Sequence, residues 1–563
     1  MTSPLVAAST YNKRPIKLLE NGGVDPDKLT RELGDIEGAL GFATRLTGTV
    51  FNVLDYGADP RGVGDSTRAF QSALDAMPSG GVLWVPPGYY MGTAGLNVPY
   101  DNITVVGAGA ATILDFTPTT TTEAVFTANG VEAFVAKDFT VTGAFAWAVY
   151  IASGSKHRII GLTASGGTRR DATGSKCGGI YLQNTSKVIV AKNVLSGNGI
   201  ADTSNCADIM LNFGTYQVTQ SVIADNDCSS STVEANIIGF DPQSCRFVRN
   251  GCRNAATLSA SSYVVGGYGI AIYNTGTVSA AELYGNVIAN NVVEDTQGTG
   301  IYVQGLQGTT VTGNTTVNTC SVQSDNSLGV GGIAVSLAEG CAVTGNTVWG
   351  SGKAGIALTA DCDYTSVTGN SIRDTTGLGI AIRSTQNDLT ITGNTVENCA
   401  NDGIGMWSDT VAVRVNVTGN TIRTTTNSGI GILASSNTSD WLITNNVISN
   451  TSGVAISDVG TNNVVLDNPG WDQIGTVTTT YPAATEYLTI LADATGGAFD
   501  VDLPAVANAQ GRVYVIKKID AGVNVVTVDP NGAETIDGAA NYPLALQYQS
   551  VSIQSDGATW WVS

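Results

Sequence analysis

The sequence predicts an all-β protein built as a parallel β-helix, and three observations lead to this prediction. The chain contains 68 glycines and only 13% charged residues, with many threonines, asparagines and valines. β-Branched residues and turn formers together favour short strands joined by tight corners. Two phrases also recur at a short interval, and each interval contains alternating apolar and polar residues without a helical pattern.

The first recurring phrase is similar to VTGNTV and indicates a solenoid. Its asparagines are Asn314, Asn346, Asn370, Asn394, Asn420 and Asn446, at spacings of 32, 24, 24, 26 and 26 residues. A period near 24 is too short for a propeller blade but suits one three-sided coil. About eleven coils over residues 180–470, each about 4.8 Å high, would give a rod roughly 50 Å long. We expect the asparagines to adopt left-handed corner conformations and to stack as a ladder.

The second phrase, GIYVQ at residue 300 and its relatives, has the alternation of a strand. Alternation places Ile301 and Val303 in the interior and Tyr302 and Gln304 outside. Applied to the earlier coils, it predicts an outward stripe that consists of Tyr181, Gln183, Asn212, Phe240, Tyr273, Tyr302 and Gln304. Flat aromatic faces beside amides are typical of a sugar-binding groove. Packing against a neighbouring subunit explains the stripe equally well.

Residues 51–90 predict the start of the rod. A strand at Phe51–Leu54 leads to a short helix that Asp65 or Ser66 can cap. The apolar face of this helix consists of Ala69, Phe70, Ala73, Leu74 and Met77, and a buried strand follows at Val82–Val85. Such a helix would cover the open end of a β-helix, which would otherwise expose unpaired strand edges.

Three pieces of this segment, VLDYGAD, DSTRAFQSAL and GGVLWVPPGYY, resemble the start of the pectate-lyase-like superfamily. That superfamily includes phage tailspikes and secreted polysaccharide lyases. With the coils, the resemblance covers about residues 50–470 and implies a right-handed, single-stranded parallel β-helix. Because its members include hydrolases, lyases, epimerases and simple binders, it implies a polysaccharide ligand without selecting a reaction.

The pattern changes at both ends of the rod, and we expect four parts: a helical attachment segment (1–48), the β-helix (49–470), a linker (471–485) and a C-terminal β module (486–563). Leu29, Leu33, Ile36 and Leu40 form a two-heptad seam, which suits either a short homotrimeric coil or a helix docked on the rod. The C-terminal module resembles C-terminal modules of phage tail fibres in the stretches GRVYVIKKID, DPNGAETIDGA and SVSIQSDGATWWVS. The resemblance implies a β-sandwich or β-prism that forms a homotrimer or contacts a receptor. Trp560 and Trp561 could stack on sugars or lie in a core.

Charge and sorting signals restrict the partners. The net charge of −20 makes nucleic acid and anionic membrane poor partners and favours a neutral or weakly acidic glycan. The opening MTSPLVAASTYNKRP lacks the apolar run of a signal peptide. We therefore expect synthesis in a host cytoplasm and a place in a virion tail, where residues 1–48 bind the tail or an adaptor protein.

No cofactor or metal is expected. The nine cysteines include no CxxC pair and no histidine partner, so we interpret them as free, buried side chains. His157 is the single histidine, and we expect it on the surface, since no acidic residue lies near it in the sequence. A Ser-His-Asp triad therefore lacks a histidine.

Glycoside hydrolysis needs only two carboxyl groups. The carboxylates nearest the stripe in the sequence are Asp208, Glu234, Asp241, Glu294 and Asp295. We predict that Glu234 and Asp241 act with Glu294 or Asp295 opposite them. Inserted loops at Gly166–Cys177, which carries Arg169 and Arg170, and at Arg253–Gly267 would add substrate contacts.

The sequence thus predicts a tailspike that binds host cell-surface polysaccharide and hydrolyses it. Two alternatives stay open. A polysaccharide lyase would cleave uronate-containing polymer by β-elimination, which needs a base at the sugar C5 and a group that neutralises the uronate. Arg169, Arg170, Lys176 or Tyr302 could serve in these roles, with or without Ca²⁺ held by aspartates. An adhesin would bind glycan without cleaving it.

Overall fold

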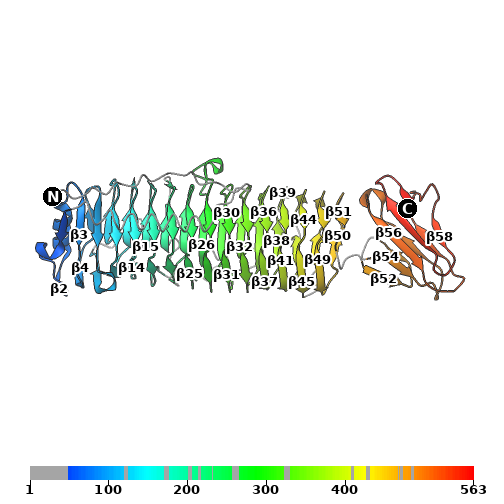
Figure 1. The fold of residues 1–563 in the computed structure, drawn as a ribbon, viewed down its shortest axis with the longest axis horizontal. Coiled ribbons are helices and arrows are strands. Elements are labelled where there is room, and N and C mark those ends of the chain that lie inside the picture. Colours follow the sequence, from blue (N-terminus) through cyan, green and yellow to red (C-terminus); the bar gives the residue numbers. More distant parts are fainter. Residues whose placement is uncertain are drawn as a thin grey trace, which may run out of the picture.

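A computed structural model describes residues 49–119, 124–169, 176–200, 206–212, 217–230, 233–256, 266–321, 330–406, 411–426, 431–466, 468, 473–483 and 487–563. The chain forms a long rod followed by a small β module, with the strands of the rod stacked side by side along its axis (Figure 1). The predicted segment 1–48 lies outside the described residues. None of the helices in the described residues is both long and apolar enough to cross a bilayer.

Three long parallel sheets form the sides of the rod, and each coil contributes one strand to each sheet. The 14-stranded sheet comprises β5 (Leu96–Val98), β8 (Phe126–Ala128), β11 (Trp147–Ile151), β15 (Cys177–Leu182), β19 (Cys206–Leu211), β23 (Ala235–Phe240), β26 (Tyr268–Tyr273), β29 (Ile301–Gln304), β32 (Gly331–Ser336), β35 (Ala354–Thr359), β38 (Ile380–Arg383), β42 (Ile404–Met406), β46 (Ile432–Ala434) and β50 (Ile456–Asp458). From β15 onward it contains eleven strands, the number of coils expected over residues 180–470.

The 16-stranded sheet forms the second side. It comprises β1 (Val50–Asn52), β3 (Gly81–Trp84), β6 (Ile103–Val106), β9 (Val135–Lys137), β13 (Arg158–Ile160), β17 (Ile189–Ala191), β21 (Val222–Ala224), β24 (Arg246–Val248), β27 (Val287–Ala289), β30 (Thr310–Thr312), β33 (Ala342–Thr344), β36 (Ser366–Thr368), β40 (Thr390–Thr392), β44 (Asn416–Thr418), β48 (Leu442–Thr444) and β51 (Val464–Leu466).

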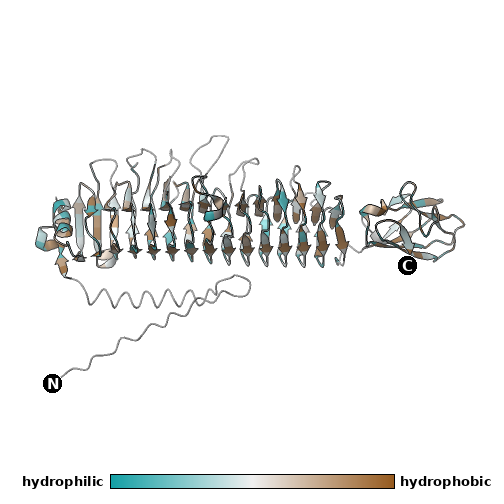
Figure 2. Ribbon diagram, turned by 90° about the horizontal axis from the view of Figure 1, so that it is seen from above, coloured by the Kyte–Doolittle hydropathy of each residue, from teal (hydrophilic) through white to brown (hydrophobic). Residues whose placement is uncertain are grey.

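The third side is a 15-stranded sheet that runs from β2 (Arg61–Asp65) and β4 (Gly88–Gly92) to β49 (Val447–Thr451). Its middle includes β22 (Asp227–Cys228), β25 (Gly251–Arg253), β28 (Val292–Glu294), β31 (Thr315–Val317), β34 (Thr347–Trp349), β37 (Ser371–Thr375), β41 (Thr395–Cys399) and β45 (Thr421–Thr425). Apolar residues recur along the strands of coil after coil (Figure 2), and one continuous apolar core fills the rod from Val53 to Val465. The predicted alternation is confirmed: Ile301 and Val303 belong to this core, whereas Tyr302 belongs to a separate cluster outside it.

The predicted asparagine ladder is present and continues from Asn193 to Asn468 inside one corner of the rod. The Asn370 amide donates from Nδ2 to Oδ1 of Asn394 and to the carbonyl oxygen of Val343, both at 2.9 Å, and each neighbouring rung repeats this pattern. The expected left-handed conformation of these asparagines is wrong. The residue before each rung from Asn193 to Asn446 adopts it instead, as Gly369 does with φ 65°. A glycine makes the turn before Asn314 to Asn420, whereas residues such as Lys192 and Asp225 make it in earlier coils; in each case the asparagine that follows points inward and bonds the next coil.

The predicted helix covers the first coil. Helix α2 (Thr67–Asp75) lies at the N-terminal end of the rod (Figure 1). Phe70 packs edge-on against Tyr90 and Phe116 of the rod interior, with ring centroids 5.6 and 5.8 Å apart. Asp65 accepts from the backbone N–H of Thr67 at 2.9 Å, so this carboxylate caps the helix start. The preceding strand is shorter than expected because a 3₁₀ turn (η1, Val53–Tyr56) begins at Val53.

The C-terminal module is a two-sheet sandwich with a core of its own. One sheet comprises β52 (Gln473–Val477), β54 (Tyr487–Ala492), β56 (Val513–Lys518), β59 (Ser550–Ser555) and β60 (Trp560–Val562). The other comprises β53 (Tyr481–Pro482), β55 (Phe499–Asp502), β57 (Val526–Asp529) and β58 (Tyr542–Leu544). Much of the predicted linker therefore pairs as strands of this module.

Trp560 and Trp561 differ in their surroundings. Trp560 is fully buried in the core of the sandwich, whereas Trp561 is 49% exposed and donates from Nε1 to Asp556 at 2.7 Å. A buried ion pair joins the module to the last coil of the rod, since Arg512 Nη2 lies 2.7 Å from Asp458 Oδ2.

Two predictions about single side chains are wrong. Cys177 and Cys206 form a disulfide between adjacent coils, because their strands pair in register and hold the two Cα atoms 4.8 Å apart, while the other seven cysteines are free and buried as expected. His157 is fully buried rather than on the surface. Its Nδ1 accepts from the Phe134 backbone N–H at 3.2 Å, and burial lowers its pKa.

Candidate functional site

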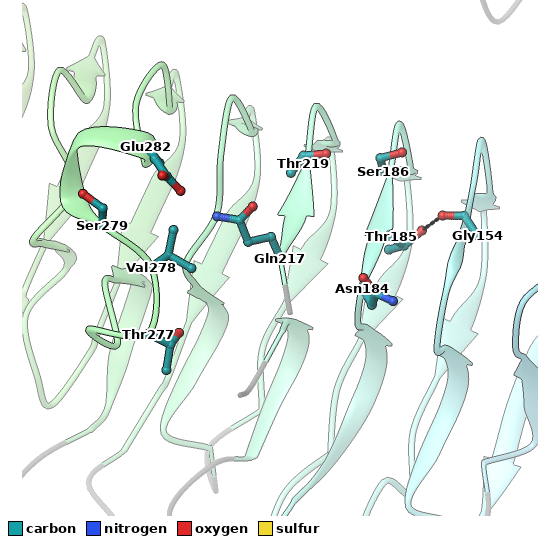
Figure 3. A pocket seen from close by; sticks show the side chains of 10 residues that line it. All are labelled: Gly154, Asn184, Thr185, Ser186, Gln217, Thr219, Thr277, Val278, Ser279 and Glu282. Carbon is teal, nitrogen blue, oxygen red and sulfur yellow. Dashed lines mark hydrogen bonds between the residues drawn. The ribbon is translucent and has the colours of Figure 1, made fainter. Parts of the chain in front are cut away.

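A polar groove runs along one corner of the rod, at the carboxyl ends of early strands of the 14-stranded sheet (Figure 3). Its cavity volume is about 650 Å³, within the range of ligand-binding clefts. The lining residues are Gly154, Asn184, Thr185, Ser186, Gln217, Thr219, Thr277, Val278, Ser279 and Glu282. Hydroxyl and amide groups dominate this lining, and Glu282 is its one charged side chain among the residues that the structure describes.

Two kinds of backbone build the groove. Its floor is a three-stranded sheet that spans adjacent coils and comprises β12 (Gly154–Ser155), β16 (Thr185–Ser186) and β20 (Val218–Thr219). Its far wall is the segment 274–285, which includes the 3₁₀ turn η3 (Ala280–Glu282). Parallel stacking places the floor residues one coil apart, so their polar side chains form a row along the rod axis. The units of an extended polymer that lay in the groove would be arranged along the same axis.

Several lining side chains are available to a ligand. Thr185 donates its hydroxyl to the Gly154 carbonyl oxygen at 2.7 Å and so helps to hold the floor together. Within the described residues, the side chains of Asn184, Ser186 and Thr219 make no hydrogen bond to the protein. Their amide and hydroxyl groups can donate to or accept from a sugar hydroxyl.

Asp241, a predicted catalytic residue, supports the wall of the groove instead. It is fully buried in the left-handed conformation (φ 49°) that ends β23. Its carboxylate accepts from the Thr275 backbone N–H at 2.8 Å, from the Thr275 hydroxyl and from the Thr277 hydroxyl at 3.0 Å. With its oxygens engaged in this way, Asp241 acts as a positioning residue for the segment that carries Glu282.

Glu234 and Asp241, which we predicted to act with Glu294 or Asp295 opposite them, do not lie side by side. The two residues flank β23 at opposite ends, and seven residues of extended chain separate their Cα atoms by roughly 23 Å. Carboxyl groups that hydrolyse glycosides lie within about 5–10 Å of each other. Glu234 is largely buried beside Tyr268 and Tyr273, where its negative charge adds to the effect of burial in raising the pKa of both phenols.

The three other predicted carboxylates also lie away from the groove. Asp208 is fully buried inside the rod and accepts from Asn198 at 2.8 Å and from Ser230; burial raises its pKa to about 6. Glu294 ends β28 on the 15-stranded sheet, and Asp295 follows it at a corner, where it accepts from Asn318 at 3.1 Å. None of the three lines the groove.

The structure gathers the predicted aromatic stripe on the outer face of the 14-stranded sheet, but this face is not an open groove. Tyr181 stacks on Tyr150 with ring centroids 5.0 Å apart, and Phe240, Tyr273 and Tyr302 form a second group further along the rod. Tyr181 and Tyr302 are only 3% and 4% exposed within a single chain. These two rings therefore offer little free surface to a sugar or to a neighbouring subunit.

The amides and cations predicted to bind substrate also have partners elsewhere. Gln183 and Gln304 accept from the hydroxyls of Tyr150 and Tyr302, at 2.5 and 3.1 Å, and Asn212 is buried. Arg169 donates to the Pro118 carbonyl oxygen. Arg170 lies outside the described residues. Lys176 is buried with its Nζ 5.5 Å from the centroid of the Tyr181 ring.

Among the described residues, no three His, Cys, Asp or Glu side chains are grouped so that they could hold a metal ion. The chemistry available in the groove is therefore hydrogen bonding by neutral groups together with one carboxylate. The chain is negatively charged and the described lining contains no cation, so an anionic ligand would be repelled. The lining therefore favours an uncharged ligand.

Comparison with known proteins agrees with this architecture. Residues 283–422 match a family described as "Right handed beta helix region". Residues 50–149 match a family described as "Rhamnogalacturonase A/epimerase, pectate lyase-like". The rod is a right-handed parallel β-helix, and the similarity to the pectate-lyase-like family concerns its first coils. A search of curated proteins found no match to this sequence.

Solved structures similar to this β-helix come from several sources. Tailspike protein 3 of bacteriophage CBA120 is 13% identical, with a TM-score of 0.50, and the match covers 91% of this chain and 69% of that protein. The A-module of the Azotobacter vinelandii mannuronan C-5 epimerase AlgE4 is 15% identical (TM-score 0.39), with 74% and 100% covered. The catalytic unit of an α-1,3-glucanase from Streptomyces thermodiastaticus is 18% identical (TM-score 0.40), with 70% and 69% covered. At these identities the likeness concerns the fold.

The groove of the β-helix was missed from the sequence for a specific reason. Its floor residues follow strands of the 14-stranded sheet by three to eight positions, where the sequence reads as ordinary corner chemistry, as in Asn184-Thr185-Ser186. One signal was present. The segment from Tyr273 to Asn286 is longer than the equivalent corner of other coils, and insertions on a rigid scaffold are where binding residues concentrate.

Proposed function

We propose that this protein is a tailspike-like β-helix that recognises a cell-surface polysaccharide through the corner groove. The observation that carries the proposal is the described part of the lining, in which hydroxyl and amide side chains repeat from coil to coil and Glu282 is the single charge. Hydrogen-bonding groups at fixed positions along a rigid rod suit a linear polymer of neutral sugars. The family matches and the neighbouring tailspike support the polysaccharide class by analogy.

Binding without cleavage is the activity that the geometry supports best. Hydrolysis needs two carboxyl groups, and the described lining offers only Glu282. Elimination from a uronate needs a group that neutralises the sugar carboxylate, and the described lining contains no Lys or Arg. Three further parts complete the proposal. Residues 1–48 attach the protein to a virion tail, and the C-terminal module forms a homotrimer. The protein is located in the virion.

The test is a binding measurement with a panel of purified capsular polysaccharides and O-antigens, both neutral and uronate-containing, read by calorimetry. Thr219→Trp would fill the groove and is expected to weaken binding at least tenfold. Thr347→Trp on the exposed 15-stranded sheet is the matched control and should bind as the unmodified chain does. Equal binding by both variants would place the glycan elsewhere.

A size-exclusion measurement of the polymer separates binding from cleavage. We expect the polymer length to stay constant during incubation with the unmodified chain. Shortening that Glu282→Gln abolishes would show that Glu282 is catalytic and would overturn the binding-only assignment. Asp241→Ala is expected to weaken binding and also to lower the thermal unfolding temperature, because it leaves the Thr275 N–H without its acceptor and places an alanine in a left-handed conformation. Unchanged binding by this variant would contradict its role in positioning the segment 274–278.

A further inference from the structure

The corner that carries the groove is built in the same way at a second place along the rod. The groove floor is the three-stranded sheet of β12, β16 and β20, and each of these strands ends three residues before a strand of the 16-stranded sheet begins. A second three-stranded sheet comprises β39 (Gln386–Asn387), β43 (Ala412–Val413) and β47 (Thr438–Ser439), with the same offset. Both short sheets therefore lie at one corner of the rod, and β39 is labelled beside β36 in Figure 1. None of the residues of the second sheet is part of the described groove lining.

Tyr364 lies against this second corner sheet with its side chain in solvent. Its backbone N–H donates to the carbonyl oxygen of Asn387 in β39 at 3.1 Å. The side chain is 66% exposed, and within the described residues its hydroxyl makes no hydrogen bond and its ring contacts no other ring or cation. Packing within the chain therefore does not account for an aromatic side chain at this position.

The backbone of Tyr364 is strained. It adopts the left-handed conformation with φ 59°, at a position where the two preceding coils have Gly308 and Gly340 and the next coil has Asp388. Glycine and aspartate adopt this conformation readily, whereas a bulky aromatic residue rarely does. Of the left-handed residues that the structure describes, Tyr364 and Tyr548 are the two aromatic ones. A strained, exposed side chain without a structural partner is typical of a binding site.

Open backbone lies on one side of Tyr364 along the rod and a fixed ion pair on the other. A Cβ added at Gly308 or Gly340 would meet no atom within 4 Å, so the two preceding coils leave this corner open. In the following coils, Arg414 donates from Nε and Nη2 to the two carboxylate oxygens of Asp388, at 2.7 and 2.8 Å. This contact fixes the guanidinium group. Its Nη1 makes no hydrogen bond within the described residues and can therefore donate to a sugar hydroxyl.

A second exposed tyrosine connects this place with the groove. Tyr284 lies in the wall segment 274–285 and is 56% exposed. It is three coils from Tyr364 at the same corner, which corresponds to about 14 Å along the axis. Between the two tyrosines the corner presents Gly308 and Gly340. Two aromatic faces separated by open backbone suit stacking on the rings of one extended sugar chain.

We propose that Tyr364 and Arg414 form a second subsite for the polysaccharide, further along the same corner. Tyr364 stacks on the apolar face of one sugar ring, and Arg414 donates to hydroxyls of that unit or the next. This rests on the glycan binding proposed above and extends it, since one polymer then occupies the groove, passes Tyr284 and reaches Tyr364. Asp363 and Asp440 at neighbouring positions of the corner disfavour an anionic unit, so the polymer is neutral. Two subsites on one rod bind a long chain more tightly than either binds it alone.

The first measurement is the affinity of the full chain for the members of the polysaccharide panel, by calorimetry. Tyr364→Ala is expected to weaken binding of the neutral polymer at least fivefold, whereas Tyr364→Trp retains an aromatic face and should bind within twofold of the unmodified chain. The matched control is Tyr548→Ala, which removes the other left-handed tyrosine, 63% exposed on the C-terminal module, and should bind unchanged. Equal binding by Tyr364→Ala and the unmodified chain, or no binding by any member of the panel, would overturn the second subsite.

Thr219→Trp separates the second subsite from the groove. Binding that is weakened in Thr219→Trp alone would overturn the second subsite and keep the groove. Binding that is weakened in Tyr364→Ala alone would keep Tyr364 as a glycan site and overturn the groove.

The dependence of affinity on polymer length is a readout that a merely structural role of Tyr364 would not change. Fragments of the bound polymer are prepared by partial acid hydrolysis and sorted by size. For the unmodified chain, affinity should rise at least fivefold once fragments span the about 14 Å from the end of the groove to Tyr364, and Tyr364→Ala should lack this rise. A rise that persists in the variant would overturn the proposal. A loss of binding accompanied by a changed molar mass in light scattering would also overturn it, because Tyr364 would then belong to a contact between subunits.

Discussion

Replacing Asn370 with alanine is expected to destabilise the rod strongly, although the substitution is remote from the groove. The side chain is 1% exposed and joins three coils. Its Nδ2 donates to Val343 and Asn394, and its Oδ1 accepts from the backbone N–H and the side-chain amide of Asn346, all at 2.9 Å. The variant would thus leave a carbonyl oxygen and two N–H groups of the neighbouring coils buried without partners.

The magnitude follows from those three groups. An unsatisfied buried polar group costs about 1–3 kcal/mol, and partial access of water lowers the sum, so we expect a loss of about 4 kcal/mol. Ser371 is the matched control, since its side chain is exposed and an alanine there should cost less than about 0.5 kcal/mol. A loss of 4 kcal/mol expressed fully in the barrier would accelerate unfolding by about three powers of ten.

The assay is the rate of unfolding in guanidinium, followed by the fluorescence of buried tryptophans such as Trp441. Rates are preferable to a midpoint because a long rod of stacked coils is expected to unfold irreversibly. Asn370→Ala should unfold at least tenfold faster than Ser371→Ala. Rates within a factor of two of each other would refute the argument that the ladder stabilises the corner.

Two further predictions concern buried groups. Burial raises the pKa of Asp208 to about 6 in the folded chain, so between about pH 4 and pH 6 the folded state binds this proton more tightly than the unfolded state does. The free energy of unfolding should therefore fall as the pH rises through this window and stay level above it, and Asp208→Asn should remove that step; an identical pH profile for the variant would contradict the assignment. Denaturation without reductant should expose seven alkylatable thiols and denaturation with reductant nine, whereas nine in both would exclude the Cys177–Cys206 disulfide.

The sequence by itself determined the repeating architecture. The period near 24, the alternation in GIYVQ and its relatives, and the recurring asparagine are local patterns, and local patterns are sufficient when each coil contacts only its neighbours. The helix at Thr67–Asp75 was equally readable, because its apolar spacing has the helical period. The resemblance to pectate-lyase-like proteins added the hand of the coil.

Only the tertiary structure decided which surfaces are open and which side chains meet. Alternation states that Tyr181 and Tyr302 point away from the rod interior, but whether another part of the chain covers them depends on contacts distant in sequence. The distance between Glu234 and Asp241 follows from their places at opposite ends of one strand, which a count of nearby carboxylates does not reveal. The groove depends on residues 154, 185, 219 and 282, which separate coils bring to one corner because parallel stacking converts sequence distance into a short step along the axis.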